Sequence, residues 1–173
     1  MALAPRLEAD LHTAASALIS VLELVEAERW THVPGSTVWS VGKDAAHVAE
    51  AAVYHQWIVR RTIGQKVSGR RPVLERQELT TVMTIELAVD LIRRRTNESA
   101  ALISSLTDEK LAMVTRPPRA RAQILADTIQ LVLIRHYDTH RRDIELKLRD
   151  PVTTPTRDET RHPLSARARR MTG

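Results

Sequence analysis

The order of apolar and polar residues along the chain predicts four long helices and no convincing strand. In the first segment, apolar residues recur at every third or fourth position, which is the spacing of an amphipathic helix. These residues are Leu7, Leu11, Ala14, Leu18, Val21, Leu22 and Val25. The pattern predicts a helix from about Arg6 to Arg29, after which Pro34 and Gly35 break the chain.

The second predicted helix has recognisable signals at both ends. Ser40 is a good N-cap residue, and Asp44 in the first turn suits the positive end of the helix dipole. Gly64 is a natural stop, because glycine readily adopts the left-handed conformation that ends many helices. We therefore expect a helix that begins after Ser40 and runs to about Ile63.

The third and fourth predicted helices run from about Leu79 to Leu106 and from about Arg121 to Leu148. Pro117 and Pro118 exclude regular helix between them, and Pro151 follows the fourth. Four helices of this length, joined by mostly short loops, predict an all-α fold of the four-helix-bundle type. In such bundles, sites are built in the core from side chains on facing helices.

The composition fits one domain and excludes thiol chemistry by the chain itself. With 173 residues, 43% of them hydrophobic, the chain is long and apolar enough to bury a core. It has no cysteine, so disulfides, cysteine metal ligands and a protein thiol nucleophile are excluded. The N-terminal segment does not resemble a signal peptide, and no stretch of ~20 uncharged apolar residues is present. We expect a cytoplasmic protein with no membrane partner.

The positive charge is concentrated at the C-terminal end. Residues 157–173 contain five arginines and two acidic residues, a net of +3, so only +2 of the formal net charge of +5 belongs to the rest of the chain. A body this close to neutral is a poor surface for duplex binding, and we expect no specific nucleic-acid partner. We assign residues 1–150 to the bundle and expect residues 151–173 to be a disordered basic tail.

Two histidines interrupt the apolar stripe of the fourth predicted helix. The stripe reads Ile129, Leu133, His136, His140, Ile144 and Leu148. Residues four apart lie about 40° apart around a helix and ~6 Å apart along it, so both imidazoles can reach one point beside the helix. One helix can give two ligands to Zn²⁺ at this spacing, although two hydrogen-bonded core histidines remain the alternative. Tyr137 stands where the zinc proteases carry a glutamate base, which excludes that family.

A third ligand has two candidates on the second predicted helix. His47 lies at the edge of the apolar arc, and His55 lies nearer its middle. They are ~12 Å apart along the axis, so a straight helix cannot bring both to one ion. Periodicity alone does not choose His47 and mildly favours His55. His12, His32 and His162 look like surface or loop residues, and we assign them no role.

Two short motifs resemble signatures of the DinB-like superfamily. The segment TVWSVGKDAAHVAEA (37–51) resembles the second-helix signature, in which a Trp-Ser pair opens the helix and a histidine follows about eight residues after the tryptophan. The segment HYDTHRRDI (136–144) resembles the fourth-helix signature, a His-x-x-x-His-Arg stretch that runs on to an isoleucine. A long first helix that ends close to Trp30 also fits. The resemblance covers about residues 5–149.

The resemblance implies a four-helix bundle, often a homodimer, in which three histidines hold a divalent metal ion, usually zinc or nickel. Carried over by position, the ligands are His47, His136 and His140. This selects His47 over His55. The fourth-helix signature often has glutamine where this chain has Asp143. For Asp143 and for Glu50, one turn after His47, orientation of a ligand and simple exposure to solvent both stay open.

The resemblance also implies a chemistry. Members include transferases and isomerases that use thiols such as mycothiol or bacillithiol, and some hydrolases. Three imidazoles leave a coordination position open, which can hold water or a thiol and lower its pKa. We therefore expect a metal-dependent S-transferase, isomerase or related hydrolase that joins a co-substrate thiol to a small-molecule electrophile. A non-catalytic interaction or regulatory bundle is the alternative. Arg141 and Arg142 are candidates to bind an anionic group, although solvated arginines are the simpler interpretation.

Overall fold

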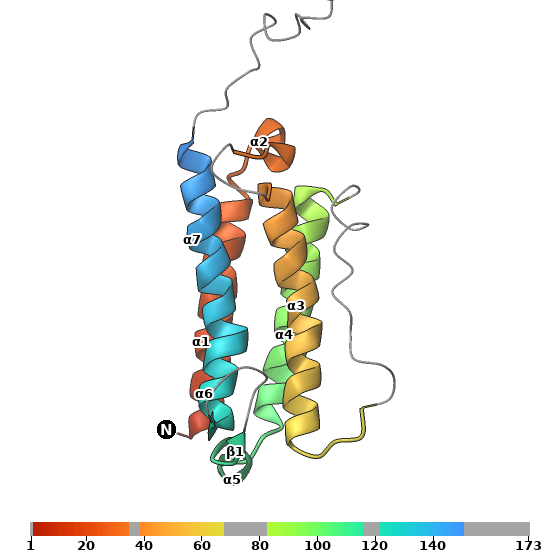
Figure 1. Ribbon diagram of the computed structural model, residues 1–173, viewed down its shortest axis with the longest axis vertical. Helices are drawn as coiled ribbons and strands as arrows, with labels where there is room; N and C mark the ends of the chain where they lie inside the picture. The colour runs from red at the N-terminus through yellow and green to blue at the C-terminus, as the bar shows by residue number, and fades with distance from the viewer. Residues whose placement is uncertain (1, 35–38, 68–82, 116–121, 151–173) are drawn as a thin grey trace, which may run out of the picture.

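The computed structural model describes residues 2–34, 39–67, 83–115 and 122–150, and most of these residues are helical (Figure 1). Its long helices are α1 (Leu3–Leu22), α3 (Val41–Thr62), α4 (Ile85–Ser104) and a C-terminal helix made of α6 (Leu125–Ile129), the π-helical turn η2 (Gln130–Ile134) and α7 (Arg135–Arg149). The shorter elements are α2 (Ala27–Thr31), α5 (Asp108–Leu111), β1 (Val114–Thr115) and β2 (Gln123–Ile124). The predicted all-α fold class is confirmed.

The long helices pack side by side, and each contacts two neighbours. Both α1 and α3 pack against α4 and against α7. In Figure 1, α1 and α7 run in one direction, and α3 and α4 run in the other. Since α3 and α7 are antiparallel neighbours, residues near the start of α3 face residues near the end of α7.

Aliphatic side chains fill the centre of the bundle, as the hydrophobic stripes predict. Fully buried residues from the long helices include Leu11, Leu18, Val48, Ile92, Ile103, Leu133 and Ile144. The ring of Tyr137 lies among them, and its hydroxyl forms a hydrogen bond of 3.2 Å with the hydroxyl of Thr96. Burial raises the pKa of the Tyr137 phenol, so the group stays neutral. The buried hydroxyl of Tyr137 therefore has a hydrogen-bond partner inside an otherwise apolar core.

Both predicted ends of the second helix are confirmed in α3. The Ser40 hydroxyl accepts a hydrogen bond from the backbone N–H of Lys43 at 3.2 Å. Gly64 adopts a φ of 75°, the left-handed conformation predicted for it. Its N–H donates to the carbonyl of Arg61 at 3.1 Å, which satisfies one of the last carbonyls of the helix.

The first helix is shorter than predicted, because α1 ends at Leu22 and not at Arg29. The chain turns after Leu22, and the short helix α2 follows. The turn leaves Leu24 82% exposed but buries Val25 and Trp30. Burial of these two side chains against the bundle outweighs the helical propensity of the segment.

Trp30 packs on α3 at a position where only glycine fits. Its indole N–H donates to the carbonyl of Met83 at 2.7 Å. A Cβ atom added at Gly42 would lie 2.8 Å from Cε2 of Trp30, closer than side-chain carbons pack. The contact fixes α2 against the first turn of α3, one turn before His47.

We expect Gly42→Ala to destabilise the protein by about 1 to 3 kcal/mol, because crowding of the Trp30 ring outweighs the gain of about 1 kcal/mol in helix propensity. Thermal unfolding would show this as a fall in Tm of about 2 to 4 °C per kcal/mol. In a Trp30→Leu background the same substitution should cost less, since the ring is gone. An unchanged or higher Tm for Gly42→Ala would mean that Trp30 gives way without cost.

The third predicted helix has a defined N-terminus in the structure. Helix α4 begins at Ile85, and the Thr84 hydroxyl caps it by accepting a hydrogen bond from the N–H of Leu87 at 3.3 Å. The predicted start near Leu79 lies outside the described residues. The predicted end near Leu106 is two residues beyond the last helical residue, Ser104.

The fourth predicted helix begins later than expected. Its predicted start near Arg121 lies outside the described residues, and the expectation of helix at Gln123 and Ile124 is wrong. These two residues pair with Thr115 and Val114 in the small antiparallel sheet of β1 and β2. Strand pairing between residues eight and ten positions apart outweighs the local helical spacing, so the helix begins only at Leu125.

The C-terminal helix contains a π-helical turn that periodicity did not predict. This turn, η2, ends at Ile134, two residues before His136. A π-helical turn inserts an extra residue into the helix and changes the direction of the side chains that follow, and such turns are common at functional sites. The turn therefore sets how the side chains of α7 face α3.

The predicted basic tail, residues 151–173, lies outside the described residues. Helix α7 ends at Arg149, just before Pro151, as predicted. Of the helices in the described ranges, none is both long enough and apolar enough to cross a membrane.

Candidate metal centre

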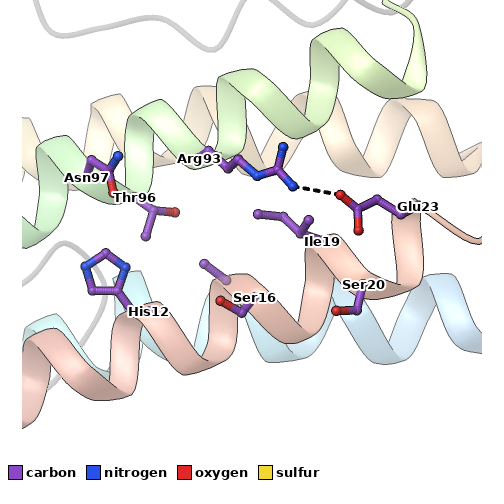
Figure 2. A pocket seen from close by; sticks show the side chains of 9 residues that line it. His12, Ser16, Ile19, Ser20, Glu23, Arg93, Thr96 and Asn97 are labelled. Atoms are coloured by element: carbon purple, nitrogen blue, oxygen red, sulfur yellow. Dashed lines mark hydrogen bonds and ion pairs between the residues drawn. The ribbon is translucent and has the colours of Figure 1, made fainter.

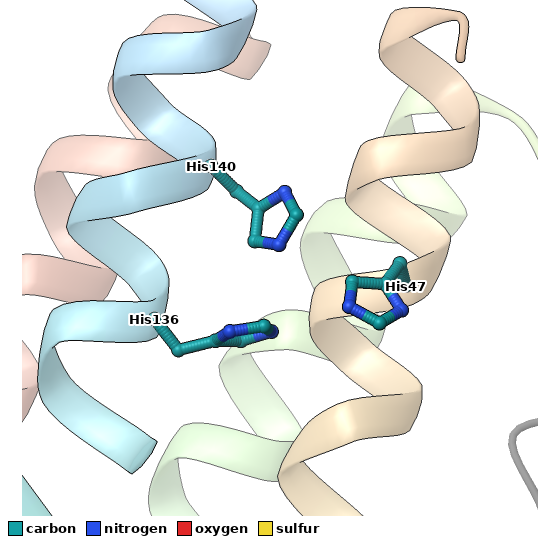
Figure 3. A group of neighbouring side chains, drawn as sticks. All are labelled: His47, His136 and His140. Carbon is teal, nitrogen blue, oxygen red and sulfur yellow. The ribbon is translucent and has the colours of Figure 1, made fainter. Parts of the chain in front are cut away.

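Three histidines from two helices converge between α3 and α7 (Figure 3). His47 projects from α3 toward His136 and His140, which come from consecutive turns of α7. One ring nitrogen of each histidine lies within 4.8 Å of the chosen nitrogens of the other two. The ring centroids are 5.2 Å apart for His47 and His136, 5.0 Å for His47 and His140, and 4.6 Å for His136 and His140. These are the three residues that the resemblance selects.

Local sequence and helix packing supply different parts of this geometry. The spacing of four residues places His136 and His140 on one face of α7. Their meeting with His47 depends on how far the two antiparallel helices are shifted along each other. The site lies at the level of the second turn of α3. The contact between Trp30 and Gly42, which holds the N-terminal end of that helix, lies one turn earlier.

His136 is held neutral and has an unpartnered ring nitrogen. Burial lowers its pKa from 6.5 to about 2, and the neighbouring imidazoles of His140, His55 and His47 act in the same direction. Its Nε2 atom is buried and makes no hydrogen bond to any part of the chain that the structure describes. Buried polar atoms without a partner are rare in native proteins. A neutral imidazole with a free nitrogen is the form in which histidine binds a metal ion.

The residues present fit a divalent metal ion. Imidazole nitrogens are good ligands for zinc and nickel. Two nitrogens bound to one tetrahedral zinc ion are about 3.3 Å apart, given Zn–N bonds of ~2.0–2.1 Å. The three nitrogens here lie within 4.8 Å of one another, so side-chain rotations that draw them together would be needed to reach that separation. Three protein ligands would leave a position open for water or substrate, as in catalytic zinc sites.

His55 lies beside the three histidines but outside their group. Its ring contacts that of His136 at a centroid distance of 5.2 Å. Burial, followed by the charge of His47, lowers the pKa of His55 from 6.5 to about 4. Its Nδ1 atom is buried and has no hydrogen-bond partner among the described residues. The group of three converging nitrogens contains His47 and not His55. Helical periodicity alone had mildly favoured His55 as the third ligand.

The indole ring of Trp39 packs against two of the three clustered histidines. Its ring stacks nearly parallel to that of His140, with 6.3 Å between the centroids, and meets the ring of His47 edge-on at 5.0 Å. The ammonium group of Lys43 lies 5.3 Å from the centre of the same indole. In the sequence Trp39 is recognisable only as part of a motif, whereas in the fold its half-buried ring covers one side of the site.

A buried ion pair beside His140 was missing from the sequence-based predictions. The Oδ1 atom of Asp44 lies 3.3 Å from Nδ1 of His140, and its Oδ2 atom accepts a hydrogen bond from the ammonium group of Lys147. Asp44 is 2% exposed and Lys147 is 7% exposed. The sequence predicts only that Asp44 suits the helix dipole. The one further signal is the position of Lys147, two helical turns after His140 and therefore on the same face.

Of the other charged candidates, two are exposed and one pairs along its own helix. Asp143 and Arg142 are exposed, which favours the solvent interpretation for both. Arg141 forms an ion pair of 2.5 Å with Glu145, one turn further along α7. Glu50 is half-buried on α3.

A hollow of about 380 Å³ lies between α1 and α4, apart from the three histidines (Figure 2). Its lining includes His12, Ser16, Ser20, Glu23, Arg93 and Asn97. Arg93 and Glu23 form an ion pair of 2.7 Å across it. Among the described residues that line this hollow, His12 is the single imidazole. The hollow therefore offers no converging set of ligands, and we place the candidate site at the three histidines.

The chain belongs to the DinB superfamily, whose sequence profile matches residues 10–144. Solved structures share its fold. A protein from Clostridium difficile 630, described as uncharacterized, has a TM-score of 0.63 at 14% identity, over 83% of this chain and 94% of that one. A protein from Streptococcus pneumoniae has a TM-score of 0.64 at 13% identity, over 85% and 91% of the two chains. No curated protein matches this chain significantly.

Proposed function

We propose that this member of the DinB superfamily binds a divalent metal ion, zinc or nickel, through His47, His136 and His140. The observation that carries the proposal is the meeting of their ring nitrogens within 4.8 Å of one another. A partly buried imidazole loses some of its hydrogen bonds to water, so aliphatic side chains would cost less free energy at these inward positions if nothing were bound. A metal ion would compensate that loss.

The proposed activity is the reaction of a low-molecular-weight thiol, such as mycothiol or bacillithiol, with a small-molecule electrophile, as in an S-transferase, an isomerase or a related hydrolase. When bound, the ion supplies a Lewis acid that lowers the pKa of a thiol or water in its open position. The chain has no cysteine, so the sulfur must arrive with the co-substrate. Membership of the superfamily supports this assignment.

The residues around the ion would have separate tasks. His136 stays neutral because burial lowers its pKa, so no proton competes for its free nitrogen near neutral pH. Trp39 packs against the rings of His47 and His140 and would restrict the access of water from that side. Lys43 carries a positive charge beside that indole, which favours a co-substrate with anionic groups.

Elemental analysis of untagged protein tests the metal site. We expect about one equivalent of zinc or nickel in the wild type, because three imidazoles make one open site. His47→Ala and His140→Ala should each weaken binding at least ~100-fold, or about 2.7 kcal/mol. His55→Ala should keep the metal, since His55 lies outside the group of three. His12→Ala, on an exposed residue, is the second control.

Circular dichroism of each variant separates loss of the site from loss of the fold. A folded wild-type protein that takes up neither zinc nor nickel would rule out the metal site and favour a non-catalytic interaction module. For the thiol, we expect metal-loaded protein to consume mycothiol or bacillithiol in the presence of an electrophile, and metal-free protein not to do so. A loaded protein that consumes neither thiol would contradict the S-transferase interpretation alone, because an isomerase or a hydrolase returns the thiol unchanged.

A further inference from the structure

The carboxylate of Asp44 connects the two helices that carry the clustered histidines. Asp44 lies on α3, three residues before His47, while His140 and Lys147 lie two turns apart on α7. Each carboxylate oxygen has its own partner, since Oδ1 faces Nδ1 of His140 at 3.3 Å and Oδ2 accepts from the ammonium group of Lys147. The side chains of His140, Asp44 and Lys147 are 12%, 3% and 6% exposed. Little water is therefore available to replace these bonds.

This contact fixes which nitrogen of His140 carries hydrogen. An ionised carboxylate only accepts hydrogen bonds, so Nδ1 of His140 must be the donor to Asp44. In the neutral ring the lone pair is then on Nε2, the other ring nitrogen, which is free to bind an ion. Histidine ligands of metals usually donate their second N–H to a carboxylate or a carbonyl in this way.

Lys147 decides how Asp44 is oriented. An ammonium group can only donate, and it occupies Oδ2, so Oδ1 is left for His140. Lysine is rarely buried unless it is paired, and an apolar residue at this inward position would pack without any desolvation cost. The presence of a buried lysine here is explained by the carboxylate that it holds.

We propose that Asp44 is a positioning residue, which holds His140 with Nε2 directed to the metal ion, and that Lys147 keeps Asp44 in the required orientation. This inference rests on the proposed metal-binding function. It adds a second layer to the site, formed by one residue from each ligand-bearing helix. Asp143, three residues after His140 on α7, has no part in this layer because it is exposed.

The sharpest test is Asp44→Asn, because the amide keeps the shape of the carboxylate but has a single oxygen. Lys147 can only donate and will take that oxygen, so the NH₂ group will face Nδ1 of His140. The hydrogen on His140 must then move to Nε2, which blocks the nitrogen that faces the ion. We expect Zn²⁺ affinity, measured by competition with a chromophoric chelator, to fall about 10- to 100-fold.

Two further variants separate positioning from a general effect on structure. Adding Lys147→Met to Asp44→Asn frees the amide to turn its oxygen toward His140, so part of the lost Zn²⁺ affinity should return. Asp143→Asn makes the same chemical change at an exposed position on α7 and should leave the affinity within about twofold of wild type. A purely structural role for Asp44 predicts that the double variant binds no better than Asp44→Asn.

The ¹⁵N spectrum of the histidine rings in metal-free protein reads the tautomer of His140 directly. Hydrogen on Nδ1 in the wild type, moving to Nε2 in Asp44→Asn, is the expected result. Hydrogen on Nε2 in the wild type would overturn the inference, as would unchanged Zn²⁺ affinity in folded Asp44→Asn. Should the wild type bind neither Zn²⁺ nor Ni²⁺, the proposed function fails, and the wild-type spectrum still decides whether Asp44 orients His140.

Discussion

Lys147→Met is expected to lower the free energy of unfolding of the metal-free protein by about 3 to 5 kcal/mol. The substitution keeps most of the apolar stem but removes the ammonium group that accompanies the carboxylate of Asp44. Asp44 is 2% exposed, so its charge cannot recover the lost interaction from water. Leaving one charge of a buried pair without its partner is among the most destabilising single changes.

Urea unfolding measures this effect, and an exposed ion pair provides the matched control. Arg93 and Glu23 form an ion pair of 2.7 Å, but their side chains are 54% and 50% exposed. Arg93→Met should therefore cost less than about 1 kcal/mol. Asp44→Asn combined with Lys147→Met should be closer to wild type than Lys147→Met alone, because no buried charge is left unpaired. Equal losses of unfolding free energy for Lys147→Met and Arg93→Met would contradict the expectation that the buried pair matters more than the exposed one.

Metal-free protein is also expected to lose stability as the pH falls below about 6.5. Burial lowers the pKa of His136 from 6.5 to about 2 and that of His55 to about 4. Below pH 6.5 the unfolded chain therefore takes up protons that the folded chain does not, so unfolding is favoured. Each histidine contributes about 1.4 kcal/mol per pH unit, and the two together lower stability by about 2 to 4 kcal/mol between pH 7 and pH 5.

The contribution of each histidine is separated by substitution, with chelator present throughout. His55→Gln should reduce the slope of unfolding free energy against pH between pH 6.5 and pH 4, where the folded and unfolded forms differ in protonation. His136→Gln should reduce it over a wider range that extends further into acid. His12→Gln, on an exposed residue, should leave the slope unchanged. Stability that is constant or rises from pH 7 to pH 5 would contradict the neutral, buried state of these two imidazoles.

The sequence predicted the parts of the fold that depend on neighbours along the chain. The stripe of apolar residues located the helices, and the ends of α3 followed from Ser40 and Gly64 because capping is a local property. Predictions failed where distant contacts outweighed local preference. The burial of Trp30 ended α1 early, and pairing of β1 with β2 delayed the C-terminal helix.

By itself, the sequence determined that His136 and His140 share one face of a helix, since a spacing of four residues fixes that geometry. Periodicity did not select His47 over His55; a family signature did, and the structure placed His47 beside the other two. Only the tertiary structure revealed the contact of Asp44 with His140 and Lys147, because Asp44 is 96 and 103 positions away from them in the sequence. Spacing within one helix is a local property, whereas contacts between helices depend on how the packed core shifts them along each other.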